Sequence, residues 1–510
     1  MSLRDIVIRA TARAPEALAI KGPDGSATYG DLNSRANRLA RALSECGVRQ
    51  GDRVGIWLEK SVDSVAAMQG ILRLNAIYVP LDPQSPPTRI LTILRDCEMR
   101  ALVTTRKRAD SVLTTEDFPL PTCLFLDETD LATFSDAALQ TLPVDADEIA
   151  YILYTSGSTG VPKGVCISNR NALAFIAWAA EVVQATSSDR FANHAPFHFD
   201  LSILDLYVAF SACAAVFLIP EGMSYMPRGL VDFIMKEKLT IWYSVPSALI
   251  LMMEHGELLH KEELPLRAIL FAGEPFPIKY LRTLYERWPA VRYLNLYGPT
   301  ETNVCTFYEV TEIQKDRLKP VPIGIASSGD TVWAQRKDAT TALVGEEGEL
   351  MVTGPTVMVG YWGKPRHGDQ AYATGDLVRL QEDGNYEYIG RRDHMVKVRG
   401  HRVELGDIEA ALAAHPGIFE VAVAALGSGL AVRLVAFVVA TDGAAPSLLE
   451  IKRHCAEHLP RYMIVDTVCF LPTLPRTRNG KVDRLALSNE DRDLNALMSE
   501  EKGQEEHASV

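Results

Sequence analysis

The chain is organised around one stretch, Tyr151-Ile152-Leu153-Tyr154-Thr155-Ser156-Gly157-Ser158-Thr159-Gly160-Val161-Pro162-Lys163-Gly164. An apolar run, 149–154, predicts a buried strand, and a loop of hydroxyl-bearing residues and glycines follows it. Glycines let backbone N–H groups turn inward, hydroxyls donate hydrogen bonds and Lys163 adds a point charge, so the loop has the parts of a phosphate-binding site. Its spacing differs from that of the P-loop, since five residues separate Gly157 from Lys163 and no Gly-Lys-Ser/Thr follows. A flexible Ser/Gly linker is the alternative, although linkers rarely follow an apolar strand directly.

Composition limits the class of protein. The 510 residues exceed what one core supports, so two or three domains are expected. The net charge of −13 argues against a general nucleic-acid binder. Eight scattered cysteines without a CxxC pair argue against a zinc or disulfide framework and fit a reducing cytoplasm. Charged residues near the N-terminus interrupt any signal-peptide pattern, and no run of 18 apolar residues predicts a membrane span.

Alternating strand and helix patterns predict an α/β fold with a largely parallel sheet. The first 25 residues or so are expected to form a helix and a turn, and Asn169 is expected to cap a later helix. Asp200 precedes an apolar-periodic run, so its local pattern predicts a helix N-cap. Further helices are expected at 31–43 and 61–74, strands at 54–58 and 77–81, and strands that run into loops near 239–247, 269–275 and 294–302. Ligands in open α/β sheets bind beyond the carboxyl ends of strands, so these loops are expected to converge on one crevice.

The later part of the chain has a different pattern. Short strands at 348–362 predict a smaller β-rich subdomain. Beyond it, helices at 406–415 and 448–459 and strands near 418–425 and 431–439 predict a small α+β domain, while 491–510 is polar and acidic and is expected to be disordered.

Several motifs together resemble the adenylate-forming enzymes, a family that includes adenylation domains of nonribosomal peptide synthetases, acyl-CoA synthetases and luciferases. Besides the phosphate loop, the matching motifs include Tyr297-Gly298-Pro299-Thr300-Glu301, Tyr372-Ala373-Thr374-Gly375-Asp376, the hinge-like stretch from Gly390 to Glu409, and Asn479-Gly480-Lys481. The resemblance implies a large N-terminal domain, 1–392, of layered αβ subdomains plus a small β-barrel-like subdomain. A small mobile α+β C-terminal domain, 393–490, and the tail, 491–510, would follow.

The resemblance implies a site for ATP and Mg²⁺. Glu301 would hold the Mg²⁺ ion, Tyr297 would stack on adenine, and Asp376 would accept from both ribose hydroxyls. A solvated loop acid and a turn residue are the alternatives for Glu301 and Asp376. The expected catalytic residues are Thr155, Glu301 and Lys481. The expected ATP-binding residues are Thr155, Ser156, Gly157, Ser158, Thr159, Gly160, Lys163, Gly273, Glu274, Asn295, Tyr297, Gly298, Thr300, Asp376, Arg391 and Lys481.

The resemblance also indicates an amino-acid substrate, because adenylation domains that take α-amino acids have an aspartate matching Asp200, which pairs with the substrate ammonium. The expected amino-acid-binding residues are Asp200, Leu201, Leu204, Tyr243, Leu270, Ala272, Leu296, Val304, Cys305 and Lys481. Apart from Asp200 and Lys481 they are apolar or aromatic, and an unpaired polar side chain among them would cost on the order of 1–3 kcal/mol. A small or medium apolar amino acid is therefore expected. Ser244 in place of Tyr243 would make the pocket larger.

The implied reaction has two halves, formation of an acyl adenylate with release of pyrophosphate and transfer of the acyl group to a thiol. Lys481 would bridge the carboxylate and the α-phosphate, Asp393 would be the hinge, and Gly400 would line the pantetheine tunnel. Met395 departs from the usual glutamine, which removes a polar contact there. A free-standing ligase is expected to act on a separate carrier protein bearing phosphopantetheine.

The pocket resembles that of the free-standing L-prolyl-carrier-protein ligases, which implies L-proline and a role in the biosynthesis of antibiotics or other secondary metabolites. The residues alone do not choose proline over alanine or valine. A D-alanine carrier ligase, an acyl-CoA synthetase and a non-catalytic nucleotide-binding relative are the alternatives. We expect a cytoplasmic monomer that binds neither nucleic acid nor membrane.

Overall fold

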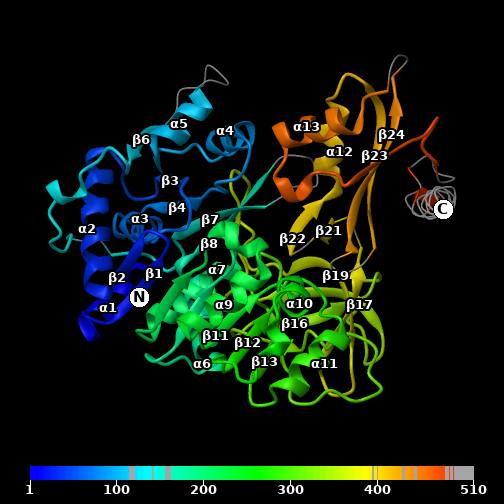
Figure 1. Ribbon diagram of the computed structural model, residues 1–510, viewed down its shortest axis with the longest axis horizontal. Helices are drawn as coiled ribbons and strands as arrows, with labels where there is room; N and C mark the ends of the chain where they lie inside the picture. Colours follow the sequence, from blue (N-terminus) through cyan, green and yellow to red (C-terminus); the bar gives the residue numbers. More distant parts are fainter. Residues whose placement is uncertain are drawn as a thin grey trace, which may run out of the picture. The chain divides into compact units, whose positions relative to one another are not determined.

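The computed structural model describes residues 1–113, 121–140, 143–155, 162–392, 395–398, 400–427, 431–441, 445–476, 482 and 486–487 (Figure 1). The chain divides into two compact units. The first contains Met1–Pro83, Ile90–Thr155 and Pro162–Asp393, and the second contains Gln84–Arg89 and the chain from His394 onward. Among the sequence predictions, the loop 156–160, Asp393, Lys481 and the tail 491–510 lie outside the described residues.

The first unit contains a seven-stranded sheet, and the phosphate loop joins two of its neighbouring strands, β7 and β8. Its strands are β3 (Arg53–Ile56), β4 (Ile77–Pro80), β5 (Ala101–Thr104), β6 (Thr122–Phe125), β7 (Ile149–Thr155), β8 (Lys163–Ser168) and β18 (Gly360–Tyr361), in the order β18-β8-β7-β4-β3-β5-β6. Strands β3 to β7 pair in parallel, whereas β8 pairs antiparallel with β7 and β18. Helices α2 (Tyr29–Glu45) and α3 (Val62–Arg73) lie beside this sheet (Figure 1) and begin with capping boxes on Thr28 and Ser61.

A second sheet of this unit has nine strands. Its strands are β1 (Leu18–Gly22), β2 (Gly25–Thr28), β9 (Arg190–Asn193), β10 (Ala215–Leu218), β11 (Ile241–Ser244), β12 (Ala268–Phe271), β13 (Arg292–Tyr297), β14 (Thr306–Glu309) and β15 (Ile325–Ala326), in the order β15-β14-β13-β12-β11-β9-β10-β1-β2. Strands β1, β10, β9, β11, β12 and β13 run parallel, so their carboxyl ends share one edge. The expected helix and turn at the N-terminus are shorter than predicted, because the strand β1 separates α1 (Arg4–Arg13) from the turn.

The remaining helical elements of this unit connect and cover the strands. They are α4 (Pro87–Asp96), α5 (Arg106–Leu113), η1 (Leu131–Thr133), α6 (Asn169–Val183), α7 (Leu201–Ile203), η2 (Leu204–Val208), α8 (Ala209–Ser211), η3 (Glu221–Tyr225), α9 (Pro227–Glu237), α10 (Pro246–His255), η4 (Leu258–His260) and α11 (Ile278–Arg287). The predicted cap at Asn169 is wrong by one residue. Ser168 caps α6 through Asn171, whereas the Asn169 side chain is buried and accepts a hydrogen bond from Leu3 N at 3.0 Å.

A four-stranded antiparallel sheet completes the first unit. It consists of β16 (Thr331–Gln335), β17 (Glu347–Thr353), β19 (Tyr372–Leu380) and β20 (Tyr386–Arg391), in that order. The prediction that 348–362 belongs to one β-rich subdomain is correct for β17 but wrong for β18, which joins β8 of the seven-stranded sheet. Tyr361 therefore lies beside the phosphate-loop strands rather than in the small sheet.

The second unit is a small α+β domain. Its elements are β21 (Met395–Val398), β22 (His401–Glu404), α12 (Leu405–Ala413), β23 (Ile418–Leu426), β24 (Arg433–Ala440), α13 (Leu448–His458), η6 (Arg461–Met463) and β25 (Thr467–Phe470). The predicted helices and the first two strands of its three-stranded sheet agree to within a few residues, whereas β25 was not predicted. Across the described parts of both units, no helix is both long and apolar enough to cross a bilayer.

Candidate active site

One group of polar side chains surrounds the Asp376 carboxylate, and we call it the Asp376 cluster (Tyr297, Thr374, Asp376 and Arg391). Asp376 on β19 and Arg391 on β20 are cross-strand partners, and Arg391 Nη1 lies 2.7 Å from Asp376 Oδ1. The Tyr297 hydroxyl at the end of β13 donates to Asp376 Oδ2. The Asp376 backbone N–H donates to Thr374 Oγ1 at 3.1 Å. A carboxylate has about four acceptor sites, so two remain after these contacts.

A second group connects the phosphate-loop strands to Glu301. Lys163 begins β8 opposite Thr155, and its Nζ lies 5.8 Å from the centroid of the Tyr361 ring. The Tyr361 hydroxyl donates to Glu301 Oε1 at 2.7 Å, and Glu301 is buried. The alternative of a solvated loop acid is therefore wrong for Glu301. A buried carboxylate beside the phosphate-loop strands has the hard oxygen that Mg²⁺ prefers.

The turns after the central strands have local reasons for their glycines. A Cβ on Gly298 would lie 1.6 Å from Asn303 O, because the loop folds back until Cys305 N donates to Tyr297 O. Gly273 has a φ of +91°, in the left-handed region. The neighbouring Glu274 accepts from Ser247 N at 3.2 Å.

Other predicted residues have structural partners. Asn295 Nδ2 donates to Pro322 O at 2.8 Å, so part of its amide is used in holding β13. Gly400, in the second unit, has a φ of +83° between β21 and β22, which by itself favours glycine there. A role in nucleotide or pantetheine binding stays a prediction for both.

The carboxylate of Asp200 lies close enough to two buried tyrosines, Tyr243 and Tyr151, to raise the pKa of each. Burial raises the pKa of Tyr243 well above its usual value, and the nearby carboxylates of Asp200 and Asp205 raise it further. Burial also raises the pKa of Tyr151, with smaller contributions from Tyr207 and Asp200. Asp200 precedes α7, but its side chain makes no capping hydrogen bond, so the local N-cap reading is wrong. The side chain is instead held near a tyrosine-lined wall.

That wall is apolar, and strand register explains its composition. Tyr243 is the partner of Leu270, and Leu270 is the partner of Leu294, so these three side chains share one face of the sheet. Ala272 and Leu296 lie two residues further along and point the same way. We call Asp200 with Tyr243, Leu270, Ala272 and Leu296 the Asp200 wall. The pleat directs Ser244 to the opposite face, where it accepts from Trp242 Nε1 at 2.8 Å.

The other predicted pocket residues divide between two clusters. Leu204 and Val304 are buried in the same core cluster as the apolar members of the Asp200 wall, and Leu201 packs against it. Cys305 lies in a different cluster with Tyr297. The short helix α7, which carries Leu201, passes directly into a π-helical turn, η2, at Leu204. Such turns are frequent at functional sites.

Two buried ionisable side chains, Asp205 and Lys60, lie close enough to influence one another, and Asp205 also influences Tyr243 of the wall. Asp205, in η2, is fully buried, and it accepts from Asn193 Nδ2 at 3.1 Å through Oδ2 while Oδ1 has no hydrogen-bond partner among the described residues. Lys60 is also buried and donates to Asn193 O at 3.0 Å and to His194 O at 2.8 Å. Burial lowers the pKa of Lys60 to about 7, although the Glu221 and Asp205 carboxylates oppose the change. Burial raises the pKa of Asp205, and Lys60 partly offsets the rise.

Sequence reasoning missed several of these residues. Tyr361 lies 60 positions from Glu301, and Lys60 lies 133 positions from Asn193, so no local pattern connects them. Tyr151 was taken only as part of the apolar strand β7. The one usable signal was Asp205, an acidic residue within the apolar run after Asp200.

Comparisons with known proteins agree on one family. The AMP-binding enzyme family matches residues 7–362, and the AMP-binding enzyme C-terminal domain matches residues 407–481. An L-proline--[L-prolyl-carrier protein] ligase of Pseudomonas fluorescens is 48% identical over 494 residues, covering 96% of this chain and 99% of that protein. A protein of the same name from Streptomyces coelicolor is 39% identical, with coverage of 89% and 90%. The solved structure of the amide bond synthetase McbA from Marinactinospora thermotolerans has a TM-score of 0.85 at 24% identity, covering 96% of this chain and 99% of that one.

Proposed function

The chain belongs to the AMP-binding enzyme family, and we propose that it is an AMP-forming ligase that activates L-proline and transfers it to a separate carrier protein. The observation that carries the proposal is the Asp200 wall, in which one carboxylate faces an otherwise apolar surface. The names of the two most similar relatives reported above support proline as the substrate and a carrier protein as the acceptor.

Proline fits the chemistry of this wall. Its side chain is a ring of methylene groups, which needs no hydrogen-bond partner. Its ammonium has two N–H groups, and the two oxygens of one carboxylate can accept both. A primary ammonium has three N–H groups, and the third would need another acceptor in this apolar environment. The buried Tyr243 and Leu270 leave the wall little room for a larger side chain.

In the first half-reaction, an oxygen of the proline carboxylate attacks the α-phosphorus of ATP. The bond from the α-phosphorus to the bridging oxygen breaks, which releases pyrophosphate and leaves prolyl adenylate. The protein's task is to align these groups and to stabilise charge. Asp376 would accept from the ribose hydroxyls with its two remaining acceptor sites, and Lys163 and Thr155 would hold the terminal phosphates. Lys481 would bridge the two reacting groups.

The residues present fit a Mg²⁺ ion at Glu301. Its carboxylate is buried and accepts a hydrogen bond from the Tyr361 hydroxyl, and a carboxylate oxygen is the kind of ligand that Mg²⁺ prefers. Bound Mg²⁺ would supply charge neutralisation at the phosphates and would keep most of its own waters.

In the second half-reaction, the phosphopantetheine sulfur attacks the carbonyl carbon of prolyl adenylate. A carbon–sulfur bond forms, the carbon–oxygen bond to phosphate breaks, and AMP leaves. Asp393 would be the hinge about which the small C-terminal domain rotates between the two half-reactions. Gly400 would line the path of the thiol. A carrier protein on another chain fits the Pseudomonas relative, because this chain covers 99% of a ligase named for its separate carrier.

The direct test is amino-acid-dependent ATP–pyrophosphate exchange across L-proline, D- and L-alanine, valine and plain carboxylic acids. We expect L-proline to dominate and to load onto a phosphopantetheinylated carrier protein as a thioester detectable by mass. Dominant exchange with D-alanine would overturn proline while keeping the reaction. Exchange with carboxylic acids alone would overturn the role of Asp200.

A further inference from the structure

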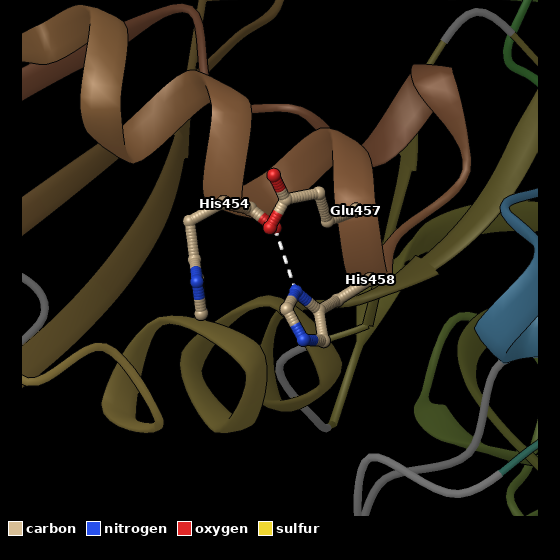
Figure 2. Close-up of side chains that lie close together, drawn as sticks. All are labelled: His454, Glu457 and His458. Carbon is tan, nitrogen blue, oxygen red and sulfur yellow. Dashed lines mark hydrogen bonds between the residues drawn. The ribbon is translucent and has the colours of Figure 1, made fainter. Parts of the chain in front are cut away.

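The last turns of helix α13, in the second unit, place three metal-binding side chains together. His454, Glu457 and His458 have the spacing i, i+3 and i+4, which brings side chains onto one face of a helix. One ligand atom from each lies within 4.8 Å of the other two, and Figure 2 shows the three side chains gathered at the end of the helix. We propose that they bind a divalent transition-metal ion of the zinc class.

Backbone contacts prepare both imidazoles for this role. His454 Nε2 lies 2.9 Å from Ala411 O, and His458 Nδ1 lies 2.8 Å from His454 O, the contact drawn as a dashed line in Figure 2. A carbonyl oxygen only accepts, so each of these nitrogens carries the proton. The lone pairs are therefore on His454 Nδ1 and His458 Nε2. Histidine ligands of metals commonly donate their other N–H to a carbonyl in this way, which fixes the tautomer.

The distances suit a site that closes on the ion. Ligand atoms about a tetrahedral zinc ion are roughly 3.3 Å apart, given bonds near 2.0 Å. One nitrogen or carboxylate oxygen of each group lies within 4.8 Å of those of the other two, so side-chain rotation must bring His454 Nδ1, His458 Nε2 and a Glu457 oxygen to the shorter spacing. Glu457 and His458 are exposed and can rotate, whereas the half-buried His454 is held against Ala411. One anchored ligand and two movable ones can make this adjustment.

The ligand set selects the metal. Two imidazoles and one carboxylate favour zinc, copper or nickel, whereas Mg²⁺ prefers oxygen ligands and near-octahedral geometry. Glu301, which we proposed above as the Mg²⁺ ligand, lies in the first unit, and that proposed site includes no histidine.

His415 is close but has a different role. Its ring stands edge-on to His454, with centroids 5.1 Å apart. Its Nδ1 accepts from Gly417 N at 3.1 Å, so that lone pair is already used. His415 therefore provides a control inside the same cluster, and the exposed pair Glu254 and His255 on α10 provides one elsewhere.

The test is titration of the chelator-treated full-length protein with Zn²⁺ against a chromophoric zinc chelator. We expect one competing site that millimolar Mg²⁺ does not displace. His454→Gln and His458→Gln should each weaken it at least about 10-fold, while His415→Gln and His255→Gln change it less than about 2-fold. Co²⁺ substitution should show no thiolate charge-transfer absorption, which separates this site from the eight cysteines.

Stability gives a second readout if a variant folds poorly. Binding to the folded state alone raises the melting temperature. Zn²⁺ should therefore raise the melting temperature of the wild type and of His415→Gln, but not that of His458→Gln, and all three should show the same proline-dependent exchange with Mg²⁺. No competing Zn²⁺ site in the wild type, or a Zn²⁺ affinity equal to that of the wild type in both His454→Gln and His458→Gln, would overturn the proposal.

Discussion

Asp376 and Asp205 are both buried carboxylates of the first unit, but their surroundings differ. Asp376 has a partner on each oxygen, the Arg391 guanidinium on one and the Tyr297 hydroxyl on the other. Asp205, which influences Tyr243 of the Asp200 wall, has one oxygen without a hydrogen-bond partner among the described residues, and Lys60 forms no ion pair with it there.

This difference suggests how the two ends of the site bind their ligands. The Asp376 cluster is assembled before ligand arrives, and it can bind ribose hydroxyls with little reorganisation. The Asp200 wall places one carboxylate among tyrosine and aliphatic side chains, and its proposed role is to pair with the ammonium of the amino acid. Changes at the two ends should therefore affect different substrates.

The largest effect is expected at Glu301, the residue proposed to hold Mg²⁺ at the phosphates during the first half-reaction. Glu301→Gln keeps the acceptor for Tyr361 but removes the charge that would hold Mg²⁺. Loss of that stabilisation should lower the exchange rate by about 100- to 1,000-fold. Tyr361→Phe is the matched control and should lower the rate less than about 10-fold, since the carboxylate remains. Equal losses would mean that Glu301 acts only through its hydrogen bond.

Asp200→Asn should raise the KM for proline by about 10- to 100-fold, because a charge-assisted pair with the ammonium is lost. The KM for ATP should change less than about 2-fold. Asp147→Asn, at the exposed ion pair with Arg170, is the control and should change neither. A parallel rise in both KM values would refute the separation of the two ends.

Asp376→Asn should show the opposite pattern, with the KM for ATP raised by about 10-fold and that for proline nearly unchanged. One ribose acceptor and the ion pair with Arg391 are both weakened. Glu347→Gln, which removes an exposed ion pair with Arg379 beside the same strand, is the control. Steady-state exchange with varied ATP measures this, and an unchanged KM for ATP would exclude Asp376 from ribose binding.

The smallest expected effect is that of Lys60 on the free energy of unfolding. The folded-state pKa of Lys60 is about 7, below its unfolded value of 10.5. Between those values the unfolded chain binds a proton that the folded chain has released, so the free energy of unfolding rises with pH; below pH 7 the full cost of the buried charge is present.

Lys60→Met should therefore reduce this rise by up to about 1.4 kcal/mol per pH unit. Urea unfolding at several pH values between 7 and 10 measures the slope. Lys21→Met, at a partly exposed ion pair with Glu237, is the control and should keep the wild-type slope. The same slope in Lys60→Met and wild type would show that Lys60 does not titrate in this window.

The sequence predicted what depends on local pattern. Apolar spacing located α2 and α13, because one face of each is buried, and a continuous apolar run located β7, which is buried on both faces. The resemblance to the family indicated Asp376 and Arg391, which the β19–β20 register brings together. It could not predict that Tyr361 joins β8, or that Lys60 reaches the carbonyls of Asn193 and His194, since these contacts join distant segments. The predicted helix caps at Asn169 and Asp200 were wrong, because neither side chain makes a capping hydrogen bond in the folded chain.

The most direct test of the account compares L-proline with cyclopentanecarboxylate, which has the same ring size but no amine. The ratio of their kcat/KM values is measured by pyrophosphate exchange in the wild type and in Asp200→Asn. We expect the wild type to prefer proline by at least about 100-fold, since the analogue lacks the ammonium that would pair with Asp200, and the variant to lose most of that preference. An equal preference in both proteins would contradict the central claim that Asp200 recognises the proline ammonium.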